Sequence, residues 1–304
     1  MKKILLLLLM PFLGMSQNQF AFGFDGTTAA MLSAGWQSTN QSSPLGAATW
    51  QNADFEVPLT GPIFGSGDVN TIPVGQAGGD NSFALVNYTS TTGARTISNW
   101  LITPDITVQN GDIVTFYSRK GTDGTTDYPD RLELRMSSVA TVLPSGASGV
   151  GSFTTLCLTI NPALAGGFVY PKTWTQYSYT VSGLTGLVPV KFAFRYYVTN
   201  GGPSGANSDI IGIDTFSVDR TLSTDSFFKN NFSVYPNPVN DVVSISSLNN
   251  SEITQVSIID VNGRVIKDVN SNVSEISVSD LNAGIYFLKI NTLDGVGTSK
   301  FVKN

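Results

Sequence analysis

Apolar and polar residues alternate at a period of two through most of the chain, whereas helical spacing is nearly absent. Half-buried β-strands produce this alternation because successive side chains point to opposite faces of a sheet. The clearest predicted strands lie at 99–102, 112–118, 131–137, 174–181, 188–197 and 211–218. Loops rich in Gly, Ser and Asn separate them. So many strands in one unit favour a two-sheet sandwich, and we expect a jelly roll for residues 17–220.

The last segment, residues 232–304, repeats the strand pattern on a smaller scale. Asn262-Gly263 stands between two β-rich runs, which is a strong hairpin signal because both turn positions favour positive φ. Pro236 and Pro238 lack amide donors, so they fit an edge or entry position and not a central strand. About seven short strands at this spacing predict a small Ig-like β-sandwich. The fold class expected for the whole chain is therefore all-β.

The first residues of the chain have a composition of their own. Met1-Lys2-Lys3 precedes an apolar run to Leu13, and small residues follow. This pattern is typical of a signal peptide cleaved before Gln17, too short to span a membrane as a stable anchor. No other stretch approaches transmembrane length. The predicted organisation is a signal peptide at 1–16, a jelly roll at 17–220, a polar linker at 221–231 and a second domain at 232–304.

Composition excludes several function classes. Histidine is absent and Cys157 is the single cysteine. Ser-His-Asp and Cys-His catalysis are therefore excluded, no His/Cys cluster supports zinc, and no catalytic residue is assigned. Residues 17–220 contain nine Lys and Arg against 14 Asp and Glu, a net charge of −5. Without a basic patch, nucleic acid is not an expected partner.

Four motifs follow one another in the C-terminal segment. They are Phe232-Ser-Val-Tyr-Pro-Asn-Pro238, the run 255–266, the run 281–290 and Gly297-Thr-Ser-Lys-Phe-Val-Lys303. The series resembles the type A C-terminal sorting domain of the Bacteroidetes type IX secretion system. The residues that carry the resemblance are Pro236, Asn237, Pro238, Asn262, Gly263, Gly284, Lys300 and Lys303. An ordinary Ig-like stalk module without a transport role is the alternative.

That resemblance implies where the protein is delivered and implies no chemical activity. It implies passage through the periplasm and across the outer membrane, with the type IX secretion machinery as partner. The product is then expected at the cell surface or in the medium.

The preceding region has its own resemblance. Its motifs are Phe24-Asp-Gly26, Gly35-Trp36, Asn99-Trp-Leu-Ile-Thr-Pro104, Tyr128-Pro-Asp-Arg-Leu-Glu-Leu-Arg-Met-Ser137 and Ile211-Gly-Ile-Asp-Thr-Phe-Ser-Val218. They come in the order seen in cleaved-adhesin, or choice-of-anchor J, domains. The resemblance implies a jelly roll on a secreted surface protein linked to adhesion, and many such domains bind structural calcium. This chain departs from the family where two acidic residues often follow one another, because Thr215 follows Asp214.

Asp25 and Asp214 are the candidate metal ligands. Calcium takes six to eight oxygen ligands from carboxylates and carbonyls. Asp25 ends the first predicted strand and Asp214 lies in the last one. Terminal strands are commonly neighbours in a jelly roll, so the two carboxylates are expected to converge on Ca²⁺. A loop cap and a solvent-facing aspartate are the alternative reading of these residues.

Candidate ligand-binding side chains are Tyr128 and Trp174, which could stack on sugar rings. The alternating charges of Arg131, Glu133 and Arg135 predict a solvated strand face. The preferred function is an exported adhesin-like protein that binds an extracellular glycan or protein. The alternatives are a secreted hydrolase acting on glycans or peptides and a structural component of a surface or matrix.

Overall fold

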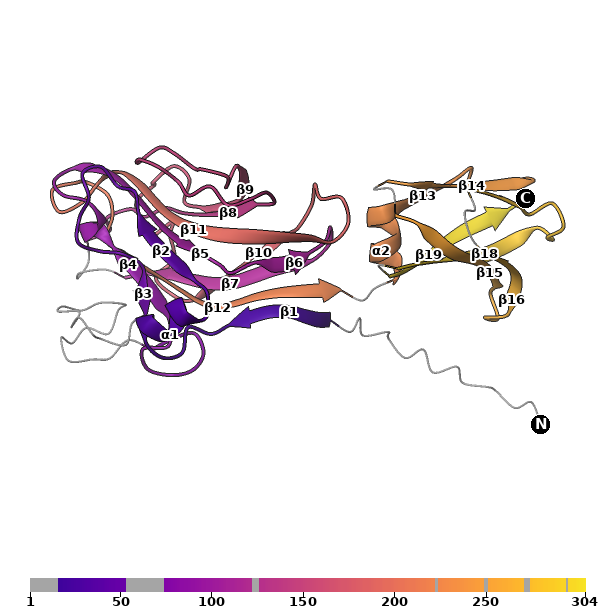
Figure 1. The fold of residues 1–304 in the computed structure, drawn as a ribbon, viewed down its shortest axis with the longest axis horizontal. Coiled ribbons are helices and arrows are strands. Elements are labelled where there is room, and N and C mark those ends of the chain that lie inside the picture. Colours follow the sequence, from indigo (N-terminus) through magenta and orange to yellow (C-terminus); the bar gives the residue numbers. More distant parts are fainter. Residues whose placement is uncertain are drawn as a thin grey trace. The chain divides into compact units, whose positions relative to one another are not determined.

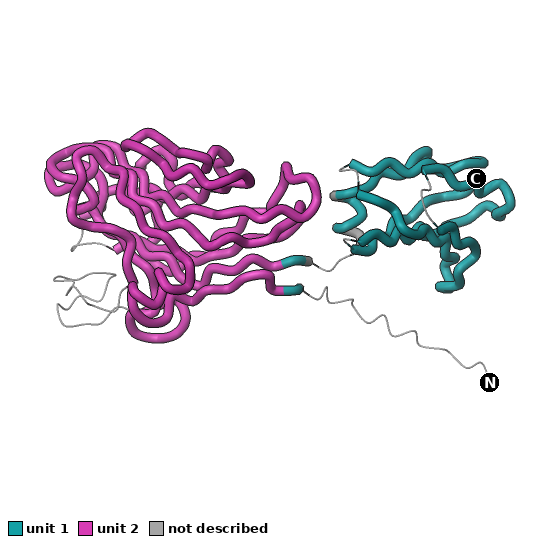
Figure 2. The backbone as a smooth tube through the Cα atoms, in the orientation of Figure 1, with its two compact units in different colours: residues 1–17, 220–304 teal, residues 18–219 magenta. Residues whose placement is uncertain are grey.

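The computed structural model describes residues 16–52, 74–121, 126–221, 224–248, 251–270, 274–293 and 295–304. The signal-peptide prediction therefore falls almost wholly outside the described residues. The chain divides into two compact units (Figure 2), one of residues 18–219 and the other of residues 1–17 with 220–304. We call residues 18–219 the body and residues 220–304 the tail. Within the described ranges, no helix is long and apolar enough to cross a membrane.

One sheet of the body joins its strands in the order β10-β7-β12-β4-β3, with β1 paired to β12 (Figure 1). The members are β1 (Ser16–Phe22), β3 (Gln51–Asn52), β4 (Ala84–Asn87), β7 (Ile113–Lys120), β10 (Thr175–Thr180) and β12 (Ile210–Thr221). The long β12 pairs antiparallel with both β7 and β4. The start of β12 consequently lies beside the end of β4, which places two loops next to each other.

The second sheet of the body has the order β2-β5-β11-β8-β9, with β6 paired to β11. Its members are β2 (Gln37–Asn40), β5 (Arg95–Ile102), β6 (Ile106–Val108), β8 (Leu132–Ser137), β9 (Thr155–Ile160) and β11 (Val188–Gly201). A short helix α1 (Thr28–Ser33) and a 3-10 turn η2 (Tyr88–Ser90) join strands. The six clearest strands of the sequence all appear, with small shifts at their ends.

The core of the body lies between the two sheets. Strand β7 alternates half-buried and buried residues along its whole length, as its sequence period requires. Phe116 of β7 meets Phe194 of β11 edge to face, with ring centroids 4.9 Å apart. Such a pair buries a large apolar area and favours one relative placement of the two rings. The prediction that the chain has an all-β fold is confirmed.

The tail has two sheets of its own, β13-β14-β17 and β16-β15-β18-β19. The strands are β13 (Phe232–Tyr235), β14 (Val242–Ser247), β15 (Ile253–Asp260), β16 (Val265–Asn270), β17 (Glu275–Ser277), β18 (Gly284–Thr292) and β19 (Val296–Lys303). Val256, Ile258, Leu288 and Ile290 are buried in one core with Val243. Described residues thus supply seven strands, the number that the turn signals predict.

Residues 221–231, expected as a polar linker, instead contain the helix α2 (Thr224–Asn231). Phe228 of this helix is buried in the core of the tail. It approaches β19 so closely that a Cβ on Gly297 would lie 3.1 Å from Phe228. The apolar pair Phe227-Phe228 explains the difference, because a helix lets both rings pack near Phe232.

Candidate functional site

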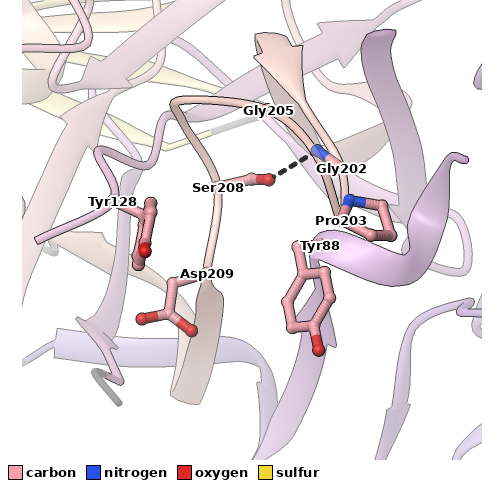
Figure 3. A pocket seen from close by; sticks show the side chains of 7 residues that line it. All are labelled: Tyr88, Tyr128, Gly202, Pro203, Gly205, Ser208 and Asp209. Carbon is pink, nitrogen blue, oxygen red and sulfur yellow. Dashed lines mark hydrogen bonds between the residues drawn. The ribbon is translucent and has the colours of Figure 1, made fainter. Parts of the chain in front are cut away.

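A hollow of about 250 Å³ opens between η2, the segment before β8 and the loop before β12. We call it the tyrosine pocket, and it is lined by Tyr88, Tyr128, Gly202, Pro203, Gly205, Ser208 and Asp209. Figure 3 shows the side chain of Asp209 next to that of Tyr128, with Tyr88 on the other side of the segment that carries Ser208 and Asp209. The two tyrosines are 39% and 40% exposed, whereas Asp209 is 8% exposed. The pocket therefore has aromatic walls that solvent reaches and a deeper acidic group.

Backbone hydrogen bonds fix one wall of the tyrosine pocket. Asn87 caps η2, since its Oδ1 accepts a bond of 2.9 Å from the Thr89 amide. The Tyr88 amide donates to the Asp209 carbonyl oxygen at 2.7 Å. This bond ties the end of β4 to the start of β12. Tyr88 and Asp209 are consequently held together by main chain and not by their own side chains.

The loop behind Asp209 is also held by specific bonds. Ser208 has φ 77°, in the left-handed region that few non-glycine residues occupy. Its amide donates to the Pro129 carbonyl at 2.9 Å, and its hydroxyl accepts from the Gly202 amide at 2.8 Å (Figure 3). These bonds keep the 202–208 loop against the segment that carries Tyr128.

A buried ionic network lies under the tyrosine pocket. Lys120 is closed off from solvent and contacts Asp127 at 2.5 Å and Asp130 at 3.1 Å. Asp130 also accepts from the Tyr196 hydroxyl at 2.6 Å and from the Asp209 amide at 2.9 Å. Burial opposes the charge on Lys120, but the carboxylates of Asp130 and Asp127 outweigh it and raise the lysine pKa. A buried charge of this kind is tolerated only when it is paired and hydrogen-bonded.

The prediction of a solvated face for Glu133 and Arg135 is wrong. Strand β11 places Arg195 beside them, and Glu133 Oε2 contacts Arg135 at 2.7 Å and Arg195 at 3.3 Å. The Arg195 guanidinium lies over the ring of Tyr197 and donates to the Ala147 carbonyl at 2.7 Å. The loop that contains Ala147 covers this face, so Glu133 and Arg195 are buried.

Of the two candidate ligand-binding aromatics, Tyr128 lines the tyrosine pocket and Trp174 does not. The Trp174 indole N–H donates to the Val74 carbonyl at 3.1 Å, and its ring meets Phe83 edge to face at 5.5 Å. Trp174 therefore holds a loop against the outer face of its sheet. The sequence missed Tyr88 and Asp209 because no local pattern distinguishes them from ordinary loop residues.

A second hollow, of about 210 Å³, surrounds the candidate metal ligand Asp25. We call it the aspartate hollow, and it is lined by Asp25, Gly26, Gly78, Asp80, Asn81 and Ser82. Asp25 Oδ1 accepts a hydrogen bond from the Ser82 hydroxyl. The buried side-chain oxygen Oδ1 of Asn81 finds no hydrogen-bond partner among the residues that the structure describes. Only glycine fits at position 78, since a Cβ there would collide with Asp25 and Ser82.

The other candidate ligand, Asp214, binds backbone amides. Its Oδ2 accepts from Gln76 at 2.7 Å and Ala77 at 3.0 Å, and its Oδ1 accepts from Thr215 at 2.6 Å. Burial raises the pKa of Asp214 to about 6, and the charge of Asp25 adds to this shift. The two carboxylates are close enough for the charge of one to act on the other, but Asp214 is not among the residues that line the hollow. Asp25 faces the hollow, whereas Asp214 anchors the loop beside it.

Two of the sorting motifs of the tail, those of Asn237 and Gly284, contact its last strand. Asn237, between Pro236 and Pro238, accepts from the Val302 amide at 2.9 Å and donates to the Lys300 carbonyl at 3.2 Å. Gly284 opens β18 and pairs with Lys303 of β19. Asn262-Gly263 forms the β15–β16 turn, where Gly263 has φ 81°. Motifs far apart in sequence are therefore joined through β19, and Asn262-Gly263 confirms its predicted hairpin.

The chain is similar to solved structures of low sequence identity. The K1 and K3 cleaved adhesin domains of Lys-gingipain from Porphyromonas gingivalis are 16% and 15% identical, each at a TM-score of 0.37. The matches cover 67% of this chain and 98% and 100% of those domains. The glycoside hydrolase domain of Endo-D from Streptococcus pneumoniae R6 is 12% identical at a TM-score of 0.33, with 88% and 37% covered. Similarities this low support no functional assignment.

The tail has a clear family match. No curated protein matches the chain. Residues 233–304 match the family described as the secretion system C-terminal sorting domain. The match spans the strands that carry all the sorting motifs, and it assigns export by the type IX system to the cell surface or medium. The tail of this chain is a type IX secretion sorting domain.

Proposed function

We propose that this chain is an exported, non-enzymatic, adhesin-like protein that takes its extracellular ligand at the tyrosine pocket. The observation that carries this proposal is that two partly exposed tyrosines, Tyr88 and Tyr128, line one pocket together with Asp209. Exposed aromatic rings are costly to leave in water and are enriched at binding sites. Here they stand on a frame of backbone bonds and a buried ionic network, so the site is ordered before a ligand arrives.

The chemistry of the pocket supports binding over hydrolysis. A glycosidase needs two carboxylates that face each other across a cleft. The described residues lining the tyrosine pocket include one carboxylate, that of Asp209. Asp130 lies below it, wholly buried and bonded to Lys120 and Tyr196. The histidine-dependent mechanisms are excluded by composition, since the chain has no histidine.

A direct test is binding by purified residues 17–304 on arrays of glycans and extracellular matrix proteins. The double variant Tyr88→Ala/Tyr128→Ala should lose at least tenfold in affinity for whichever probe the unmodified chain binds. Tyr235→Ala is the matched control, because this tail tyrosine is 54% exposed and lies outside the pocket. Equal binding by all three proteins would refute the pocket assignment. Turnover of any arrayed substrate would refute the non-enzymatic one.

The aspartate hollow supports a second proposal, a structural calcium ion. Asp25, Asp80 and Ser82 line one small hollow with Asn81, whose Oδ1 accepts no hydrogen bond from the described part of the chain. Oxygen donors of this mixture suit Ca²⁺, which accepts carboxylates, amide oxygens and hydroxyls together. Among the described residues, no group of three or more His, Cys, Asp or Glu side chains is placed so that it could hold a metal ion. Neutral oxygens would therefore have to complete the coordination, with Asp214 holding the adjacent loop in place.

Chelation tests the calcium proposal. A ligand present at 100 times its Kd stabilises the folded state by about 2.7 kcal/mol. Chelator should then lower the Tm of the chain by several degrees, and added Ca²⁺ should restore it. Asp25→Asn should remove the difference between the two conditions. An unchanged melting curve in chelator would eliminate the site.

A further inference from the structure

We propose that the side chains of Lys120 and Asp127 condense into a covalent amide, an isopeptide bond, with Asp130 as the carrier of protons. The inference goes beyond the proposed function, because the chain modifies itself once and turns over no substrate. It is independent of what the tyrosine pocket binds. Three features carry it: the enclosure of the lysine, the contacts of its nitrogen and the hydrogen bonds of the two carboxylates.

The Lys120 side chain is enclosed at the end of β7, where no solvent reaches it. Asp130 is equally buried, and the Asp127 side chain is 10% exposed. The lysine Nζ lies over the ring of Phe168, 5.7 Å from its centroid. Charged groups lose their hydration in such an enclosure, whereas an amide is neutral. Condensation therefore removes one ammonium and one carboxylate charge from a place where both are costly.

The three protons of the Lys120 ammonium have three acceptors. Nζ lies 2.5 Å from Asp127 Oδ1, 3.1 Å from Asp130 Oδ2 and 2.7 Å from the Tyr128 carbonyl oxygen. The contact with Asp127 is shorter than the about 2.7–2.9 Å that is usual between a charged N–H and a carboxylate. Reacting groups that a fold holds together have an effective concentration far above any in solution, which favours condensation between them.

The hydrogen bonds of the two carboxylates give them different roles. Asp127 Oδ2 accepts from the Phe168 amide at 2.7 Å, and this N–H would stabilise the negative charge that develops on Oδ2 when Nζ attacks Cγ. Asp130 Oδ1 accepts from the Tyr196 hydroxyl at 2.6 Å and from the Asp209 amide at 2.9 Å, whereas its Oδ2 faces the lysine nitrogen. Burial raises the pKa of Asp130, so this carboxyl can hold a proton. Asp127 is therefore the group that is attacked, and Asp130 carries the proton.

The reaction balances within these groups. The bond between Lys120 Nζ and Asp127 Cγ forms, the Cγ–Oδ1 bond breaks, and Oδ1 leaves as water. Two ammonium protons move to that oxygen, one directly and one through Asp130 Oδ2, while the third stays on the amide nitrogen and faces the Tyr128 carbonyl. The positive and negative charges cancel, no electron is transferred and no co-reactant is needed. The new bond ties the end of β7 to the segment that carries Tyr128.

The experiment measures the mass of purified residues 17–304 and of their tryptic peptides. We expect an intact mass that is lower than the sequence value by one water molecule. Trypsin should release residues 120–131 as one peptide, because an acylated Lys120 is no longer a cleavage site, and the fragment ions should show a ring from Lys120 to Asp127. An ion pair without the bond would keep the full mass and would be cleaved after Lys120, and this result would overturn the proposal.

Variants assign the lost water to these residues. Lys120→Arg, which keeps the positive charge, and Asp130→Asn should both restore the full mass. Lys191→Arg is the matched control and should keep the lower mass, because Lys191 pairs at 3.3 Å with Asp105, whose side chain is 68% exposed. The mass of the unmodified chain decides whether the bond exists even if Lys120→Arg or Asp130→Asn does not fold.

A second route to the same mass has its own control. Asp123-Gly124 lies between the two bonded residues in the sequence, and an Asp-Gly pair can lose water by closing a succinimide. Hydroxylamine opens a succinimide and leaves an isopeptide bond intact. A loss of water that persists in Lys120→Arg, or that hydroxylamine reverses, would overturn the proposal. A ring that closes at Asp130 in place of Asp127 would overturn the roles given to the two aspartates.

Discussion

The body buries several charged side chains, whereas the described part of the tail keeps its charged side chains in contact with solvent. The body buries Lys120, Asp130, Glu133, Arg195, Asp209 and Asp214. In the described part of the tail, no charged residue is buried, and its ion pairs join partly exposed side chains such as Lys267 and Asp280. Buried ion pairs are weak contributors to stability, because the cost of removing two charges from water offsets most of their attraction. What the buried charged groups supply in the body is fixed loop geometry. Lys120 and Asp130 lie under the tyrosine pocket. Arg195 holds the loop that contains Ala147, and Asp214 anchors the loop beside the aspartate hollow.

The tail is instead stabilised by apolar packing around one small core. Its motif residues are joined by backbone and amide bonds to β19, at the surface of that core. The secretion machinery must recognise a transport signal at the protein surface. Such a signal therefore needs an ordered surface and does not need buried charged groups. The contrast predicts that the two regions will respond differently to deletion, substitution and pH.

The largest expected effect is on export. Deleting residues 232–304 should leave the chain in the periplasm, because the sorting domain is then absent. Immunoblots of periplasm, cell surface and medium would measure this in a host with the type IX system. The full-length chain with Lys267→Met is the control and should be exported normally. Surface delivery of the shortened chain would show that the address lies elsewhere.

A large effect on stability should follow from Lys120→Met. Removing one partner of a buried ionic network leaves uncompensated charge on Asp127 and Asp130 and costs about 3–5 kcal/mol. Urea unfolding of residues 17–304 measures the loss. Lys267→Met in the tail is the matched substitution, and its midpoint should stay within experimental scatter because that ion pair is solvated. Equal losses from the two substitutions would contradict the contrast between the regions.

A smaller effect is expected on the pH dependence of the free energy of unfolding. Burial raises the pKa of Asp214 to about 6 from its ordinary 3.8, so the folded state holds this proton more tightly than the unfolded state does. The free energy of unfolding should therefore fall as pH rises from about 4 to about 6, to the extent that Asp214 controls it. Asp214→Asn should remove that component. Urea midpoints for both proteins at pH 4, 5, 6 and 7 would measure it, in chelator so that no cation competes with the proton.

If Asp214→Asn keeps the full pH dependence of the unmodified chain, another carboxylate is responsible. If stability rises through that window in the unmodified chain and not in the variant, the sign assigned to Asp214 is wrong.

The last prediction concerns the rate at which the Cys157 thiol is alkylated. Burial raises the pKa of the Cys157 thiol to about 12, so at pH 8 about one molecule in ten thousand carries the reactive thiolate. Iodoacetamide should label the folded chain far more slowly than the chain in urea, as mass spectrometry would record. Labelling at the same rate in both states would show that Cys157 is not packed as described.

Much of the fold could be predicted from the period of the sequence. The six clearest strands of the body, the seven strands of the tail and the Asn262-Gly263 turn all follow from short-range patterns. The helix α2 was missed because eight residues that contain two phenylalanines among polar side chains resemble a polar connector when their packing surface is unknown. The solvated face expected at Glu133 failed for a similar reason, since its partner Arg195 is distant in sequence.

The sequence by itself determined the all-β class, the sorting motifs and the absence of histidine chemistry, because each of these depends on local pattern or on composition. Only the tertiary structure decided which polar residues share a site. Antiparallel pairing of β4 with β12 brings Tyr88 to Asp209, and the bond from the Ser208 amide to the Pro129 carbonyl brings in the segment of Tyr128. Nothing in the sequence distinguishes Lys120 and Asp130 from other ionisable residues. The fold buries both side chains, and a buried charge is tolerated only when it is paired.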